Sequence, residues 1–172
     1  ALAQALPELI PAASQGTMNN LTFGGSDNGK LFAYYETIGG GAGAGPGSKG
    51  CDGIHVHMSN TLNTPVEALE YAFPIQVTEY RLRKGSGGGG KFHGGDGLVR
   101  GIRFLTPARA TITSERRRFA PYALQNGNPG QVGENSLIRD GQEISLPGKS
   151  EVNLNAGDII RIATPGGGGW GK

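Results

Sequence analysis

The sequence has a single cysteine, Cys51, and little net charge. No internal disulfide can form, so a reducing, cytoplasmic setting fits this cysteine use best. No stretch approaches the roughly 20 apolar residues of a membrane-spanning helix, and no signal-peptide pattern is present. The formal charge of +2 is too small to indicate binding to nucleic acid or to a membrane surface.

The sequence also lacks an initial methionine and begins within what reads as a helix over residues 1–9, ended near Pro7 and Pro11. We therefore expect a fragment, a processed chain or the tail of a longer polypeptide. A length of 172 residues fits one domain, which we take to span residues 1–172.

Glycine is abundant, at 32 of 172 residues, but without a collagen-like period. Short alternating apolar runs lie between the glycine clusters, and Asn28-Gly29 and Asp140-Gly141 are typical hairpin turns. We predict an all-β fold, an antiparallel β-sandwich or distorted barrel with one short helix and glycine-rich loops, including a loop over 39–50. The expected strands are 17–23 (closed by Gly24 and Gly25), 31–38, 75–83, 98–105, 109–114, 136–139, 142–146, 149–154 and 158–163. Over residues 98–105, the apolar residues Leu98, Ile102 and Phe104 alternate with the basic residues Arg100 and Arg103.

Residues 85–91 match the spacing Gly-x-x-x-x-Gly-Lys of a phosphate-binding loop. Phe92 stands where such a loop needs Ser or Thr to hold Mg²⁺, and no helix pattern follows. The segment therefore favours a wide β-turn or bulge over a nucleotide site.

Residues 54–67 carry the most polar chemistry. Ile54, Val56 and Met58 alternate with His55 and His57, which predicts a half-buried strand with both imidazoles on the other face, about 7 Å apart. The following residues predict a short helix from Pro65 to about Tyr71, with Thr64, Pro65 and Glu67 forming a capping box.

Three interpretations of the two histidines stay open. They could ligate a metal, since neutral imidazoles suit Zn, Fe or Mn, although the glutamate typical of a cupin site is absent. They could face an active site completed by another chain, or bond neighbouring loops. A basic run at 114–119 is either a solvated edge or an anchor for an anionic group. We assign catalysis to His55 and His57, substrate binding to Asn19, Asn20, Asn60, Asn63, Arg116 and Arg117, and no metal site to this chain alone.

Several motifs together resemble the hydantoinase B/5-oxoprolinase family. The resemblance runs from about residue 5 to the end in family order, and it covers the C-terminal third of such a subunit. It rests on Ala13-Ser14-Gln15-Gly16-Thr17-Met18-Asn19-Asn20, Asp52-Gly53-Ile54-His55-Val56-His57-Met58-Ser59-Asn60-Thr61, Asn63-Thr64-Pro65-Val66-Glu67, Arg116-Arg117-Arg118-Phe119, and residues 35–41, 94–100 and 165–171.

This resemblance implies a component of an ATP-dependent hydrolase of cyclic amides such as hydantoins or 5-oxoproline. A hydantoinase A-type ATPase subunit would phosphorylate the carbonyl oxygen, and the B subunit would then open the activated small-molecule ring. ATP would bind the partner, and a divalent metal would be held mainly by the N-terminal part of the B subunit. Acetone- or acetophenone-type carboxylase subunits are related alternatives. A non-catalytic β scaffold and a free-standing cupin-like metalloenzyme are competing classes.

Overall fold

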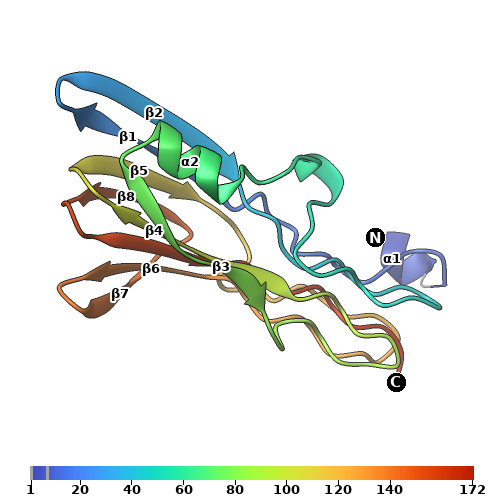
Figure 1. Cartoon of the computed structure of the whole chain (residues 1–172). Helices are drawn as coiled ribbons and strands as arrows, with labels where there is room; N and C mark the ends of the chain where they lie inside the picture. Colours follow the sequence, from blue (N-terminus) through green and yellow to red (C-terminus); the bar gives the residue numbers. More distant parts are fainter. Residues whose placement is uncertain (1, 7) are drawn as a thin grey trace.

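Two antiparallel β-sheets pack face to face in a computed structural model that describes residues 2–6 and 8–172 (Figure 1). One sheet has the strand order β2-β1-β5-β8 and the other has the order β3-β4-β9-β6-β7. The strands are β1 (Asn20–Asp27), β2 (Lys30–Thr37), β3 (Ile75–Arg83), β4 (Gly97–Phe104), β5 (Ala108–Thr113), β6 (Glu134–Arg139), β7 (Gln142–Leu146), β8 (Lys149–Leu154) and β9 (Ile159–Ala163). The prediction of a sandwich is confirmed, and the alternative of a barrel is not.

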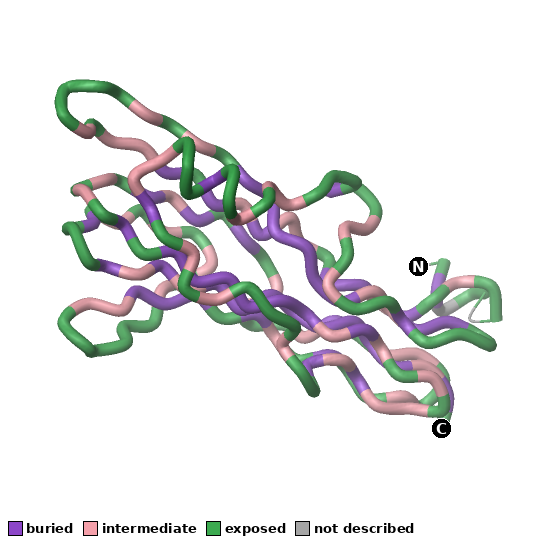
Figure 2. Tube along the Cα trace, in the orientation of Figure 1, coloured by how far each residue is buried: buried purple, intermediate pink, exposed green. Residues whose placement is uncertain are grey.

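Alternation of apolar side chains forms the core between the sheets. Leu21 and Phe23 of β1 are each 1% exposed and face Ile102 and Phe104 of β4. The rings of Phe23 and Phe104 meet edge to face, with centroids 5.2 Å apart. Burying side chains of this size stabilises the fold by roughly 1.5–3 kcal/mol each. Figure 2 shows the buried residues along the strands of both sheets and in the segments beyond them.

Both predicted hairpin turns are confirmed. Asn28 and Gly29 link β1 to β2, with φ angles of 48° and 79°. Asp140 and Gly141 link β6 to β7, with φ angles of 51° and 76°. Two successive positive φ angles twist the chain as the paired strands require, so these local signals fix the register of both hairpins.

The glycine-rich segments are packed, which the prediction of loops did not foresee. We call residues 11–16, 39–54, 85–97, 121–133 and 164–171 the glycine bundle; they run beside one another beyond the sheets (Figure 1). Gly167 N donates to Gly95 O and Gly95 N donates to Ala42 O, each at 2.8 Å. A Cβ on Gly167 would lie 1.9 Å from Ala42 O, so the segments approach as closely as they do because side chains are missing.

Several predictions about individual elements need correction. β1 starts at Asn20, not at residue 17, and Gly24 and Gly25 lie inside it, where both pair with β5. Arg100 of β4 shares the core-facing parity of Leu98 and Ile102 and is 1% exposed. Its charge is matched by a buried partner, Glu36. The helix predicted over residues 1–9 is shorter in the structure: α1 spans Leu2–Ala5, Leu6 and residues 8–10 are not helical, and residues 1 and 7 lie outside the described part.

The strand predicted for residues 54–58 is wrong. Ile54 forms one isolated bridge with Gly40, and His57–Ser59 form a 3₁₀ turn, η1. Met58 is 86% exposed, so no apolar face stands against the core. Five alternating residues carry too little information to separate a strand from an irregular loop.

The predicted capping box is also wrong. Helix α2 (Val66–Ala72) has Pro65 at its N-cap and no side-chain cap, and it buries Leu69 in the core. The Thr64 amide donates to Glu36 Oε1 at 3.0 Å, and Glu67 is exposed. Within the described residues, no helix is long and apolar enough to cross a membrane.

Candidate functional site

Two segments that are far apart in sequence meet around a cavity of about 280 Å³. Both belong to the polar motifs that the sequence analysis singled out. The first segment precedes β1 and the second follows Ile54. The lining residues are Gln15, Gly16, Thr17 and Met18 from the first segment and Val56, His57, Met58 and Ser59 from the second. We call this the histidine cavity.

His57 is the predicted catalytic residue that lines the histidine cavity. Its φ angle is 56°, a left-handed conformation that histidine adopts more readily than most residues but still at a cost. Ser59 holds the turn, because its hydroxyl donates to Val56 O at 3.0 Å. The turn therefore presents an exposed imidazole at the cavity.

A chain of buried polar groups leads from the histidine cavity into the protein. Gln15 Oε1 accepts from Asn19 Nδ2 at 2.5 Å, and Asn19 Oδ1 accepts from Arg117 Nη1 at 2.8 Å. Arg117 also donates through Nη2 to Asn135 Oδ1 at 2.6 Å. Burial, with repulsion from Arg83, lowers the pKa of Arg117 to about 10, so it stays charged at neutral pH. These guanidinium contacts join the segment before β1 to β6.

Gln15 lines the cavity, although the sequence analysis assigned it no role beyond membership of a family motif. It is 1% exposed, and its Nε2 has no hydrogen-bond partner among the described residues. A buried donor left unpaired costs about 1–3 kcal/mol, so a group that reached it would gain stability. The available signal was a long polar side chain between small residues, directly before Gly16, whose φ is 62°.

His55 contacts Asn63 and is not among the residues that line the histidine cavity. Its Nε2 lies 3.3 Å from Asn63 Oδ1, and Asn63 Nδ2 donates to Thr37 O at 2.8 Å. Tyr80 OH also donates to Asn63 Oδ1 at 3.4 Å. His55 and Asn63 thus tie the loop to β2 and β3, and the structure does not bring the two imidazoles onto one face.

The other predicted binding residues lie around the site and not in the cavity wall. Asn19 is fully buried beneath it, and Asn20 Oδ1 accepts from Tyr35 OH at 3.0 Å. Asn60 is exposed and ends η1. Arg116 Nη1 donates to Ala120 O at 3.2 Å, and its guanidinium lies against Gly16.

The basic run lines a separate and larger cavity of about 760 Å³. Residues 114–119 form one wall and residues 145–149 form the other. Lys149 Nζ pairs with Glu115 Oε1 at 2.8 Å, so part of the positive charge is neutralised within the chain. Arg116 and Arg118 remain as the cations with which an anionic group could pair.

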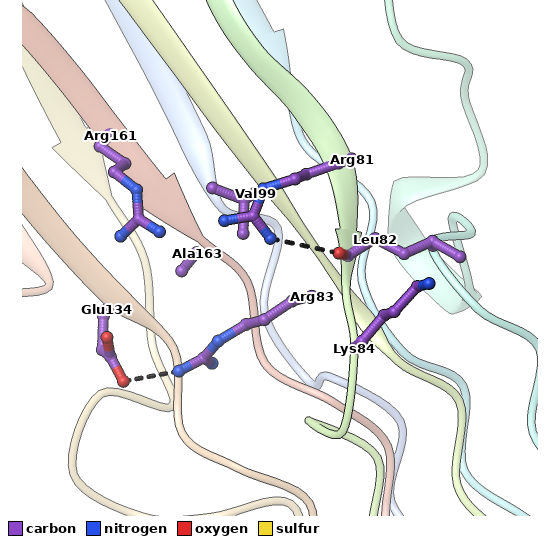
Figure 3. A pocket seen from close by; sticks show the side chains of 8 residues that line it. All are labelled: Arg81, Leu82, Arg83, Lys84, Val99, Glu134, Arg161 and Ala163. Carbon is purple, nitrogen blue, oxygen red and sulfur yellow. Dashed lines mark hydrogen bonds and ion pairs between the residues drawn. The ribbon is translucent and has the colours of Figure 1, made fainter.

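A third cavity, of about 430 Å³, lies against β3, β4, β6 and β9 (Figure 3). Its arginines already have acidic partners. Arg83 Nη2 pairs with Glu134 Oε1 at 2.5 Å, and Arg161 Nε pairs with Glu79 Oε1 at 3.1 Å. The lining residues are Arg81, Leu82, Arg83, Lys84, Val99, Glu134, Arg161 and Ala163. These pairings make the cavity a weaker candidate than the histidine cavity.

The described residues do not fit the divalent metal that the family resemblance implies. Among residues 2–6 and 8–172, no three His, Cys, Asp or Glu side chains lie close enough to hold a metal ion. His55 turns toward Asn63 and His57 toward the cavity, so their nitrogens do not converge. We therefore derive no chemical step through a metal at these residues.

The domain combines a two-sheet β-sandwich, the glycine bundle and the histidine cavity, and these three features describe its class. The chain belongs to the hydantoinase B/oxoprolinase family, whose profile matches residues 1–172. It is 50% identical over 162 residues to 5-oxoprolinase 1 of Arabidopsis thaliana, which covers 94% of this chain and 12% of the plant protein. The chain therefore spans about an eighth of that relative.

Two solved structures share the fold. The ATP-dependent caprolactamase of Pseudomonas jessenii superposes with a TM-score of 0.82 at 26% identity, covering 99% of this chain and 32% of that one. A nucleotide-free acetone carboxylase gives a TM-score of 0.78 at 16% identity, over 99% of this chain and 28% of that one, and shows the fold alone. The same domain thus occurs within much longer chains of different lengths.

Proposed function

We propose that this chain is the C-terminal domain, or a small split subunit, of an ATP-dependent cyclic-amide hydrolase of the hydantoinase/5-oxoprolinase B type. Its role is to help bind and open a ring that an A-type ATPase partner has activated with ATP. The observation that carries the proposal is the histidine cavity, formed by two of the motifs that mark the family. The single exposed cysteine supports a cytoplasmic setting.

The chemistry assigned to His57 follows from its position. Phosphorylation of the amide oxygen makes the ring carbon electrophilic, and water then attacks that carbon. His57, exposed at the cavity, accepts the proton of this water. The ring C–N bond of the adduct then breaks, with the proton passing to the leaving nitrogen, and a second water hydrolyses the resulting acyl phosphate to a carboxylate and phosphate. The metal and the ATP site belong to the N-terminal part of the B subunit and to the A-type partner.

The test is His57→Ala in the assembled enzyme, with His93→Ala as the matched control. His93 is also exposed but lies in the glycine bundle, away from the cavity. We expect His57→Ala to lower the kcat of ring opening about 10²-fold, while ATP phosphorylation continues and becomes uncoupled. The melting temperature should change far less than the turnover.

Unchanged ring opening by the His57→Ala enzyme would place the chemistry elsewhere and favour a scaffold role. Carboxylation of acetone or acetophenone, with bicarbonate required and no ring opening, would instead favour the carboxylase alternative. The shared fold of the acetone carboxylase is the observation that keeps this second candidate.

A further inference from the structure

Thr64, the last residue of the loop that carries the two histidines, is held through all three of its polar groups. Its amide donates to Glu36 Oε1 at 3.0 Å, and its carbonyl accepts from Arg100 Nη2 at 3.3 Å. Its hydroxyl accepts from Tyr34 OH at 2.6 Å. We call residues 54–64 the histidine loop and Tyr34, Glu36 and Arg100 the Thr64 clamp.

The Thr64 clamp comes from both sheets of the sandwich. Tyr34 and Glu36 lie on β2, and Arg100 lies on β4. Arg100 Nε and Glu36 Oε2 are 3.0 Å apart, with side chains only 0% and 3% exposed. Burial raises the pKa of Tyr34, so its phenol stays protonated and can donate to Thr64. The end of the histidine loop is therefore fixed to the rigid core.

Asn63, which precedes Thr64, is held by Tyr80, a residue that also contacts Arg100. The Arg100 guanidinium stacks on Tyr80, with Cζ 4.5 Å from the ring centroid, and Tyr80 OH donates to Asn63. Beyond these anchors the loop is open, since Met58 is 86% and Leu62 is 90% exposed. The position of the intervening His57 thus depends on how its loop is anchored.

A buried ion pair is a poor way to gain stability, because apolar replacements of similar volume are often neutral or better. The pair formed by Glu36 and Arg100 does what an apolar pair cannot: it bonds both backbone groups of Thr64. The buried charges of Arg100 and Glu36 therefore help to fix the position of Thr64 at the end of the histidine loop. This points to a role in placing the loop more than in holding the sheets together.

We propose that Tyr34, Glu36 and Arg100 are positioning residues, which act on ring opening by holding the histidine loop so that His57 faces its cavity. This inference rests on the proposed function. It predicts that loosening the Thr64 clamp impairs the step that uses His57 and leaves activation by the ATPase partner intact.

The first test is Tyr34→Phe in the assembled enzyme, with Tyr35→Phe as the matched control. Phenylalanine keeps the ring contacts with Phe23 and Phe73 and removes only the hydroxyl. The Tyr35 hydroxyl bonds Asn20 and Thr37 and does not touch the loop. By hydrogen exchange, Tyr34→Phe should deprotect residues 54–64 selectively, and Tyr35→Phe should not.

The second test follows turnover in the same assembly. Tyr34→Phe and Thr64→Val should each lower the kcat of ring opening about fivefold, with ATP consumption continuing. The double variant should be no worse than either single variant, because both remove the same bond. Thr64→Ser keeps the hydroxyl and should restore the wild-type rate.

Additive losses, or a drop in melting temperature with unchanged kcat, would show a merely structural clamp and overturn the inference. Failure of the proposed function looks different, because His57→Ala itself would then leave ring opening intact. If His57→Ala abolishes ring opening while Tyr34→Phe leaves both exchange and kcat unchanged, the positioning role alone is wrong.

Discussion

The carboxylate of Glu36 lies inside the sandwich, where Oε1 accepts from the amide of Thr64 and Oε2 forms an ion pair with Arg100 Nε at 3.0 Å. Glu67 is exposed on the surface of α2, and its side chain does not cap the helix. The two glutamates near the same loop therefore differ in how much they matter for stability. A desolvated charge depends on its partners, whereas an exposed charge does not.

Glu36→Gln should lower the free energy of unfolding by about 3–5 kcal/mol, since it leaves the Arg100 charge buried without its counter-ion. Glu67→Gln is the matched control and should stay within about 0.5 kcal/mol of wild type. Urea denaturation of the three proteins measures both values. Equal, small losses would mean that Arg100 finds another partner after the substitution.

Asp158 makes the stability of the fold depend on acid. The Arg139 guanidinium, which donates to its carboxylate through Nε and Nη2, holds the pKa of Asp158 below its usual range. Because the folded pKa is lower than the unfolded value of about 3.9, this stabilisation is complete above the unfolded pKa. It is lost as the pH falls through the folded pKa.

Asp158→Asn should therefore lower the melting temperature most at pH values above about 5. The difference from wild type should shrink as the pH falls below about 4. Melting curves recorded from pH 7 to pH 2 test this. A difference that does not change with pH would show that the carboxylate acts through its shape and hydrogen bonds, not through its charge.

At the scale of elements, local sequence signals predicted the hairpins and most strands. Asn28-Gly29 and Asp140-Gly141 need only their own backbone conformations to form their turns, and the strand predicted for 75–83 matches β3. The glycine bundle was not predictable in this way, because many of its glycines, such as Gly167, are required by a backbone atom of a distant segment. Arg100 was misread for the same reason: its partner Glu36 lies on another sheet.

The histidine loop shows where pattern reading fails in the site. Alternation over residues 54–58 predicted a strand, but His57 begins the 3₁₀ turn η1 and His55 contacts Asn63. The motif residues before β1 were noticed, yet Gln15 gave no chemical signal until the fold placed it against the second segment. Which polar residues share a cavity is decided by tertiary packing.

Gly167→Ala tests the packing of the glycine bundle. A Cβ there would lie 1.9 Å from Ala42 O, a backbone atom that cannot rotate away, so we expect a loss of about 3 kcal/mol or more. Gly45→Ala is the control in the same bundle, because its nearest neighbours would be side-chain atoms at 3.6 Å. That variant should stay within about 1 kcal/mol of wild type. Similar melting temperatures for both variants would show a loosely packed bundle.

At the scale of the whole molecule, the chain has a well-packed core, and its described residues supply only part of the site that we propose. The histidine cavity offers a proton acceptor and polar groups, without an acid cluster to hold a metal. The curated and solved relatives that carry this domain are several times longer. We therefore expect activity to need polypeptide beyond these residues.

The purified chain should hydrolyse neither ATP nor a hydantoin. Residues 85–91 have the spacing of a phosphate loop, but the Gly88 amide donates to Gly167 O at 2.8 Å and is not available to a phosphate. The measurement is phosphate release from ATP by the folded chain, with folding checked by circular dichroism, before and after addition of the A-type ATPase and the remaining B region. Ring opening should appear only in the complete assembly. ATP turnover by the chain alone, at a rate that survives removal of trace ATPases, would show that it holds a nucleotide site that neither its motifs nor its cavities reveal.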